Sequence, residues 1–396
     1  MNPEAQSSTT VYSRLLLPVI ISAGAVGLSI GLIIPLTSII LEQRGTSVIA
    51  IGFNAVMYSL AVLLTGPFLP ALIQRIGLLR TMIAGALLSG GIVFCLWAND
   101  ALWFWYIMRF FLGIAGGMHW VSSEAWINAM APERSRGSIV GAYTTVWTMG
   151  IAAGPVLLRF IGVEGGRPFV VAALLMAGAS LPLLLVPKVK NGQLPPVRHG
   201  VLQMIWVAPI ATAAGFISGF LETQVLSLLP VYGMRSDIGT AHALALLSIF
   251  SVGSFASQPF IGWVADRISF KTVSLMVTII AVTIVPLVHF SLKLVLLSSI
   301  LLFIWGGSVG AYYTLGMLNI GQAFKASDLT AASSMFVMAY TVGMVLGPMA
   351  GSASMQLLGP AGLLAVMGVV PLIFFPLVLR ANMDSSKFQK KNIKVL

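Results

Sequence analysis

An arginine, a histidine and a glutamate lie inside one apolar stretch, between Arg109 and Trp126, of a chain in which charge is otherwise scarce. On a helix, small and polar side chains would share a face with Arg109, within roughly 60° of it: Gly113, Gly116, Trp120, Ser123 and Glu124. An arginine keeps its proton, so it would be a fixed positive charge beside which a carboxylate could exchange a proton. The alternative without a function is that the arginine side chain extends to the membrane surface and that the glutamate lies at a helix end.

The element that holds these charges must be a membrane helix, because the composition excludes a soluble domain. Of 396 residues, 58% are hydrophobic and only 8% are charged. Repeated apolar runs of this length are typical of an all-α membrane protein with many spanning helices. A charge at the centre of such a helix costs roughly 3 kcal/mol or more, and it usually marks a functional site.

The sequence contains no enzyme, cofactor or metal signature. Cys95 is the only cysteine, which excludes an intramolecular disulfide and a thiolate metal site. There is no phosphate-binding loop, no nucleophile elbow and no cluster of metal ligands. We therefore expect no enzymatic activity, no cofactor and no metal. Energy for any transport must come from an ion gradient or from the gradient of the cargo.

Twelve apolar segments follow one another along the chain. We expect twelve transmembrane helices at 15–41, 48–72, 79–98, 101–130, 137–161, 168–187, 201–232, 241–265, 271–291, 295–322, 330–356 and 360–380. The proline-containing, basic segment 188–200 predicts a linker between two six-helix bundles, 15–187 and 201–380. Residues 1–14 form a polar tail that we expect to be disordered, and residues 381–396 form a basic tail.

The net charge of +11 predicts orientation rather than nucleic-acid binding. With the N-terminus inside, 16 lysines and arginines fall on the cytoplasmic side, 5 fall outside, and Arg109 lies within the membrane. Such a bias predicts that both termini and the 188–200 linker are cytoplasmic. We expect an integral protein of the bacterial cytoplasmic membrane, monomeric in the lipid bilayer.

The two halves repeat each other at an offset of 193 residues. Gly150-x-x-x-Gly154-Pro155 returns as Gly343-x-x-x-Gly347-Pro348, and Gly113 matches Gly306 at the same offset. This indicates a duplicated six-helix unit with pseudo-symmetry about the membrane normal. The charges are not repeated, because Arg109 falls on Leu302 and Glu124 on Met317. The asymmetry favours a task for these charges beyond packing.

These motifs resemble the major facilitator superfamily over nearly the whole chain. Gly262-x-x-x-Asp266-Arg267 is similar to the family's loop between the second and third helices of a half, and Arg109-x-x-x-Gly113 to its fourth-helix arginine motif. The first implies a cytoplasmic clasp made by Asp266 and Arg267, which stabilises one conformation. The N-terminal copy has Pro70 and Gln74 instead, so we expect only the C-terminal clasp.

The glycine–proline motifs resemble the fifth-helix motif of exporters in that superfamily. Glycines permit close helix approach and a proline bends a helix, so these residues imply hinges in both halves. The spacing of Arg109, Trp120 and Glu124, together with the segment from Gln258 to Asp266, narrows the resemblance to the YcaD-like branch of bacterial carriers. That branch brings no defined substrate.

Glu222 is the first candidate for a coupling acid, with Glu124 the second. Counted from an outer end at Tyr232, Glu222 lies about as deep as Arg109, roughly 12–15 Å along its helix. Glu124 is 15 residues from Arg109, about 22 Å, and cannot pair with it. Polar and aromatic residues within the apolar segments could contact cargo or merely join helices: Asn54, Tyr58, Trp120, Tyr143, Trp147, Tyr312, Tyr313 and Asn319.

The sequence thus predicts a secondary transporter that works by alternating access. We expect the protein to export a small molecule, which could be amphipathic, in exchange for protons. Two alternatives stay open: an uptake symporter or uniporter for a polar metabolite, and a receptor-like membrane protein that has lost transport.

Overall fold

In the computed structural model, residues 3–132, 135–187, 204–265, 267–323 and 326–381 are described, and no strand occurs in these ranges. Helices dominate because lipid offers the backbone no partners, so each apolar segment must satisfy its own N–H and C=O groups. Ten helical segments within the described ranges are long and apolar enough to cross a membrane. The two other predicted segments correspond to α5, which carries the charges, and to the shorter apolar stretch Arg167–Leu183.

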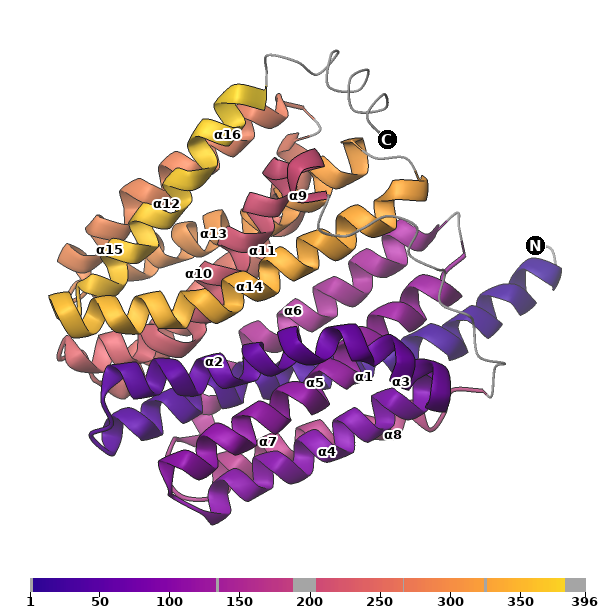
Figure 1. The fold of residues 1–396 in the computed structure, drawn as a ribbon, viewed down its shortest axis with the longest axis horizontal. Helices are drawn as coiled ribbons and strands as arrows, with labels where there is room; N and C mark the ends of the chain where they lie inside the picture. The colour runs from indigo at the N-terminus through magenta and orange to yellow at the C-terminus, as the bar shows by residue number, and fades with distance from the viewer. Residues whose placement is uncertain (1–2, 133–134, 188–203, 266, 324–325, 382–396) are drawn as a thin grey trace. The chain divides into compact units, whose positions relative to one another are not determined.

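The first half contains eight α-helices and a short 3₁₀ turn among its described residues (Figure 1). They are α1 (Pro3–Gln43), α2 (Val48–Thr65), η1 (Gly66–Phe68), α3 (Leu69–Ile76), α4 (Leu78–Ala98), α5 (Leu102–Met130), α6 (Arg136–Ile161), α7 (Arg167–Gly178) and α8 (Ser180–Leu183).

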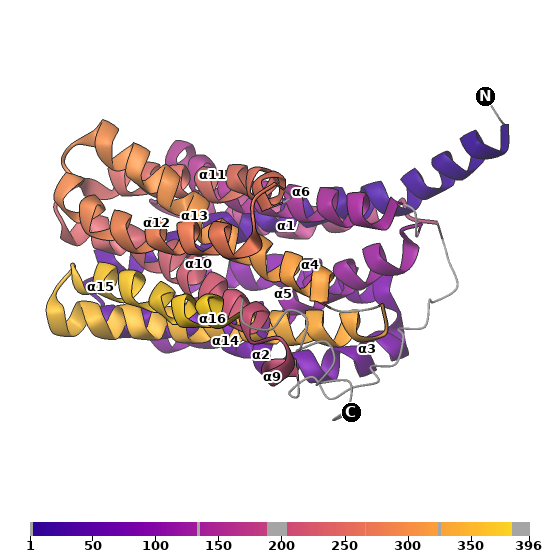
Figure 2. The same ribbon diagram turned by 90° about the horizontal axis from the view of Figure 1, so that it is seen from above.

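The second half also contains eight α-helices and one short 3₁₀ turn among its described residues. Its elements are α9 (Met204–Val207), α10 (Pro209–Arg235), α11 (Gly239–Ala265), α12 (Phe270–Ser291), α13 (Val295–Ala323), α14 (Ala326–Leu358), α15 (Gly362–Val369), η4 (Val370–Ile373) and α16 (Phe374–Ala381). Figures 1 and 2 show its long helices running side by side.

Three local expectations are wrong. The disordered tail was expected up to residue 14, but α1 already begins at Pro3. The segment expected at 201–232 is divided at Ala208 into α9 and α10, and α10 continues to Arg235. The segment expected at 48–72 continues to residue 76 through the η1 turn, where prolines at positions 67 and 70 remove backbone donors.

Gly77 separates α3 from α4 with a backbone angle φ of +91°. This conformation is costly for any residue with a Cβ atom, so glycine is required for so tight a break. Gly77 is one of the few residues that the first half retains from the cytoplasmic loop motif. The residue thus serves chain reversal even though the acid of the motif is missing there.

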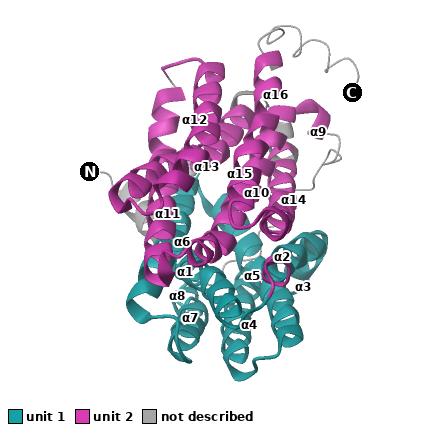
Figure 3. Ribbon diagram, turned by 90° about the vertical axis from the view of Figure 1, so that its left-hand side faces the viewer, with its two compact units in different colours: residues 1–46, 53–195 teal, residues 47–52, 196–396 magenta. Residues whose placement is uncertain are grey.

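The chain divides into two compact units, coloured separately in Figure 3. The first unit comprises residues 1–46 and 53–195, and the second unit comprises residues 47–52 and 196–396. In the first unit α1 packs along α6, and α4 packs along α5 and α7. In the second unit α10 packs along α14, and α11 packs along α13.

Glycines bring the paired helices of each unit into backbone contact. A Cβ atom on Gly154 would fall on the backbone of Gly31 in α1, and a Cβ atom on Gly347 would fall on the backbone of Phe220 in α10. Gly150 and Gly343 meet the same partner helices one turn earlier. Pro155 and Pro348 lie inside α6 and α14. Both motifs therefore lie at a close helix pair within one unit.

Candidate functional site

Arg109 is almost completely enclosed in the first unit, with only 2% of its surface exposed. Its guanidinium carbon lies 5.6 Å from the ring centre of Tyr58 on α2, a cation–π contact. Its Nε and Nη1 atoms have no hydrogen-bond partner in the described part of the chain. A buried charge with unused donors is costly, so Arg109 is poised to bind an acceptor.

Two glycines of α5 make room for Tyr58. A Cβ atom on Gly113 would fall on the Tyr58 carbonyl oxygen, and one on Gly116 would lie 2.7 Å from the Tyr58 hydroxyl. The Arg109-x-x-x-Gly113 spacing therefore places the arginine one helical turn above the point where α5 touches α2.

The register of α2 and α5 brings Asn54 to the level of Arg109. Gly113 contacts α2 at Tyr58, and the rings of Phe53 and Tyr106 stack edge to face with their centres 5.1 Å apart. The two contacts advance in the same direction along both helices, so the helices run parallel. Asn54 is 2% exposed, and its Nδ2 atom has no hydrogen-bond partner among the described residues.

Aromatic groups line α5 and α6 on the side of Arg109 toward the C-terminal end of α5. Trp120 and Trp147 stack with their ring centres 6.3 Å apart and an interplanar angle of 17°. The hydroxyls of Ser123 and Tyr143 form a hydrogen bond of 2.9 Å. Both tryptophans remain partly exposed, whereas Tyr143 is buried. Trp120 and Trp147 are therefore the more accessible members of this predicted group.

Glu124 is partly buried, and Asn128 donates to its backbone carbonyl at 2.9 Å. Its side chain forms no ion pair among the described residues. The structure therefore gives Glu124 no partner that would mark it as the coupling acid.

His119 is fully buried between helices, as its angle of about 80° from Arg109 predicts. Its Nε2 atom lies 2.9 Å from the Ser22 hydroxyl, which donates its own proton to the Ala179 carbonyl at 2.6 Å. Since that hydroxyl has one proton, Nε2 of His119 must be the donor. His119 thus joins α1, α5 and the α7–α8 turn.

Glu222 in the second unit accepts a hydrogen bond of 2.8 Å from the Tyr340 hydroxyl. Gly219 lets α10 approach α14 so closely that a Cβ atom there would fall on the Tyr340 carbonyl oxygen. The ring of Tyr340 stacks edge to face on Tyr313, which in turn stacks on Phe336. Glu222 therefore stands beside a tyrosine cluster.

Tyr340 is the site residue that the sequence analysis missed. The repeat offset of 193 residues places it opposite Trp147, a predicted cargo contact. Applying the offset to each candidate would have found it.

The other two candidates on α13 are placed differently. Tyr312 is fully buried, donates to the Thr278 hydroxyl at 3.2 Å and packs edge to face on Phe374. Its hydroxyl is therefore used in joining helices. Asn319 is partly exposed near the end of α13.

The predicted clasp falls partly outside the described residues, because Asp266 is not among them. Its neighbour Arg267 is exposed, donates to the Trp263 carbonyl at 3.1 Å, and lies 3.9 Å from the centre of the Trp263 ring. Nothing described lies within 4 Å of a Cβ atom on Gly262. The clasp stays a prediction.

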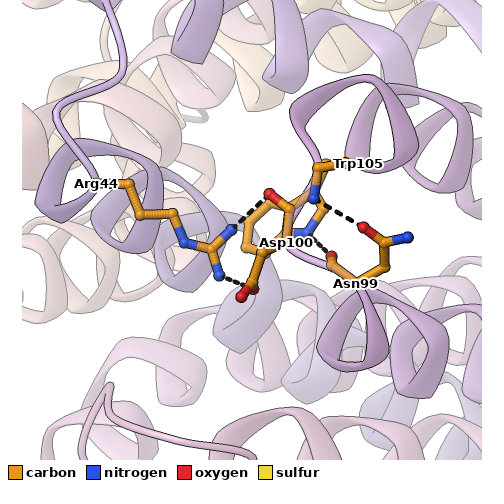
Figure 4. A network of polar contacts seen from close by, with 5 residues as sticks. Arg44, Asn99, Asp100 and Trp105 are labelled. Carbon is orange, nitrogen blue, oxygen red and sulfur yellow. Dashed lines mark hydrogen bonds and ion pairs between the residues drawn. The ribbon is translucent and has the colours of Figure 1, made fainter.

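An exposed arginine of the first unit shows the opposite environment to Arg109 (Figure 4). Arg44 forms an ion pair with Asp100, donates to its carbonyl at 3.2 Å, and lies 4.7 Å from the ring centre of Trp105. The Trp105 indole donates to the Asn99 carbonyl at 2.8 Å. This network joins the α1–α2 and α4–α5 connections, which the predicted topology puts on the same side of the membrane.

The depth comparison between Arg109 and Glu222 needs correction. It took Tyr232 as the outer end of the helix, but α10 continues to Arg235. At 1.5 Å per residue, Glu222 lies about 20 Å from that end and Arg109 about 10 Å from the start of α5. Equal depth counted from helix ends therefore does not support their pairing.

A cavity of about 380 Å³ lies within the second unit, between α9, α10 and α14. Its lining is apolar except for Thr212 and holds none of the predicted cargo residues. Within the described ranges no three metal-ligating side chains come together.

Comparison with known proteins gives a consistent picture. The model of the Major Facilitator Superfamily matches residues 19–307 and 211–394. The chain is 27% identical to the MFS-type transporter YfkF of Bacillus subtilis, over 85% of this chain and 88% of that one. It is 24% identical to the MFS-type transporter YcaD of Salmonella typhi, over 94% and 97%. The expected resemblance to YcaD-like carriers is confirmed.

Solved structures support the same fold. The nucleoside transporter NupG aligns with a TM-score of 0.75 at 12% identity, over 92% of this chain and 99% of that one. A bacterial homolog of the human lysosomal transporter Spinster aligns with a TM-score of 0.70 at 15% identity, over 93% and 97%. Likeness at such low identity shows the fold alone.

Proposed function

Because this chain belongs to the major facilitator superfamily, we propose that it is a secondary active transporter that exports a small molecule in exchange for protons by alternating access. Family membership makes it a membrane transporter, and the export direction, the proton exchange and the size of the cargo are the proposed part. The observation that carries the proposal is the pair of lone charges inside apolar helices. Arg109 has unused donors, and Glu222 is held by Tyr340.

Arg109 supplies the fixed charge of this mechanism. Its guanidinium cannot lose its proton under physiological conditions, so it attracts an acceptor throughout the cycle. The Tyr58 ring and the glycine contacts of α5 hold the side chain in place without neutralising it. An acceptor can therefore be exchanged at Arg109 without rebuilding the helix pair.

Glu222 is the proposed proton carrier. The Tyr340 hydroxyl can donate to the ionised carboxylate, and it can accept from the protonated acid, so the contact survives a change of protonation. We propose that Glu222 is ionised in one state of the transport cycle and takes up a proton in another. Glu124 is the second candidate.

The glycine–proline motifs support the export direction by their likeness to those of exporters. Gly154 and Gly347 each hold a helix pair at backbone distance, which suits helices that pivot as one body. The charge bias supports a bacterial cytoplasmic membrane with both termini and the 188–200 linker inside. We also propose that Asp266 and Arg267 form a cytoplasmic clasp that stabilises the outward-facing state.

The test begins with identification of the cargo. Cells that overexpress the protein are screened for altered drug susceptibility and metabolite content against cells with Arg109→Ala. The purified protein is then placed in proteoliposomes with a pH-sensitive dye inside. Proton exchange predicts that cargo movement in one direction acidifies or alkalinises the lumen in proportion. Cargo accumulation without any dye response would contradict the proposal and favour a uniporter or another coupling ion.

A further inference from the structure

We propose that Arg109 and Asn54 form a binding subsite for an anion, and that the cargo carries a single carboxylate group which binds there. That the bound anion is a transported cargo rests on the proposed function. The anion subsite itself rests on the structure of the first unit. It adds a substrate class that the family assignment does not supply.

The subsite consists of donors without acceptors. An arginine has five N–H donors and no acceptor, and two of the three nitrogens of Arg109 are unpartnered in the described structure. The Nδ2 atom of Asn54 is a third nitrogen that can only donate, and it is also unpartnered. Both side chains are 2% exposed, so bulk water does not satisfy them. Buried donors of this kind select a ligand that only accepts.

The geometry brings these donors together. Tyr58 contacts Gly113 and Gly116, and Phe53 stacks on Tyr106, five residues before Tyr58 on α2 and seven residues before Gly113 on α5. Arg109 and Asn54 lie between these two contacts on α5 and α2. The aromatic pair and the Tyr58 ring therefore bound the region in which the three free nitrogens lie.

In the described part of the first unit, no carboxylate forms an ion pair with Arg109. Among its described side chains, Asp100 is paired with Arg44, and Glu124 lies about 22 Å along the helix from Arg109. The described contact of the Arg109 guanidinium is with the face of the Tyr58 ring rather than with a carboxylate. The charge is thus left for a ligand.

The charge count favours a monoanion. Arg109 is the only arginine or lysine of α2 and α5, so the subsite offers one positive charge. A carboxylate matches it in charge and in hydrogen-bond geometry, whereas a phosphate dianion would leave an uncompensated charge in a buried place.

The test uses formate, the smallest carboxylate, on the purified full-length protein in detergent. The thermal midpoint is measured while sodium formate replaces sodium sulfate at constant ionic strength. Formate should raise the midpoint of the unaltered protein by about 2 °C and saturate. The rise should disappear in Arg109→Leu and persist in Arg44→Leu, which changes an arginine outside the subsite.

A second variant keeps the test decisive if Arg109→Leu does not fold. Asn54→Leu removes one donor only and should weaken formate binding roughly tenfold. An identical midpoint curve for the unaltered protein and both variants would overturn the subsite, as would no saturable response at all. Loss of the response in the variants, with no dye signal in proteoliposomes, would uphold the subsite and refute the proton exchange.

Discussion

The α2–α5 pair of the first unit and the α11–α13 pair of the second unit share one packing design but differ in chemistry. Gly113 meets the carbonyl of Tyr58, and Gly306 meets the carbonyl of Phe250 in the same way. In the first unit the turn above this contact holds Arg109 with unused donors. In the second unit the corresponding residue is Leu302, which is buried, while Phe250 packs on Trp305 at 5.3 Å.

The α1–α6 and α10–α14 pairs differ in the opposite sense. Gly150 of α6 contacts α1 at Gly24, and Gly343 of α14 contacts α10 at Phe216. At these contacts, the corresponding residues of α1 and α10 are 192 positions apart in the sequence. That offset puts Ile30 opposite Glu222. Arg109 and Glu222 thus each have an aliphatic counterpart in the other unit, Leu302 and Ile30. Packing needs neither charge, since the repeated helix pair forms without it, which points to a role in transport.

Making the first unit resemble the second should have the largest effect. Arg109→Leu is expected to lower transport at least about 100-fold, because the fixed charge is lost. The thermal midpoint should stay within about 2 °C or rise, because a buried charge with unused donors destabilises the fold. The measurement is cargo counterflow alongside thermal unfolding. Leu302→Met, at the repeated position, should keep transport within about twofold. Normal counterflow in Arg109→Leu would break the comparison.

Disturbing what the units share should be nearly as harmful. Gly154→Leu places a side chain on the backbone of Gly31, so it should separate α1 from α6 and reduce transport at least about 30-fold. Gly141 lies on the same helix with nothing within 4 Å of its Cβ position, and Gly141→Leu is the matched control. Transport by Gly154→Leu at the level of this control would show that the close helix pair is not needed for motion.

Removing the group that holds Glu222 should have an intermediate effect. Tyr340→Phe deletes one hydrogen bond to the Glu222 carboxylate and leaves the ring stacked on Tyr313. Proton-driven transport should fall roughly tenfold. The assay measures cargo uptake into proteoliposomes, driven by a pH difference across their membrane. Tyr312→Phe is the control, because that hydroxyl bonds Thr278 instead. Equal effects of the two changes would contradict a special role for Tyr340.

The smallest effect is expected from the clasp, which the sequence gives to the second unit only. Asp266→Asn should raise the cytoplasmic accessibility of cavity residues about threefold, the shift expected for one charge at a helix end. Thiol labelling of a cysteine introduced at Trp147 would measure it. The matched change Gln74→Asn, at the degenerate copy, should do nothing. Unchanged labelling in a folded Asp266→Asn protein would remove the clasp from the account.

Helix positions were largely predictable, because apolar length and charge determine where a chain can cross lipid. The observed bounds of α4, α5 and α6 lie within one residue of those expected. The start of α1 was not predictable, because polar residues can continue a helix. The break at Ala208 was not predictable either, because a local backbone turn leaves no hydropathy signal.

The candidate site was predictable in its residues but less so in its partners. Arg109 was identified by its rarity in an apolar segment. Its contact with Tyr58 depends on the register of two helices distant in sequence, which spacing along one helix does not give. Tyr340 was missed for the same reason, and the depth of Glu222 was misjudged because α10 extends to Arg235.

The central claim is that one unit supplies a fixed positive charge and the other a proton-carrying acid. Glu222→Gln in proteoliposomes tests it most directly, with Glu164→Gln, an exposed loop residue, as control. The amide cannot exchange a proton, so cargo accumulation driven by a pH difference should vanish, while counterflow, which moves no net protons, should continue. If Glu222→Gln still concentrates cargo against its gradient under a pH difference, Glu222 is not the coupling acid and the claim is contradicted.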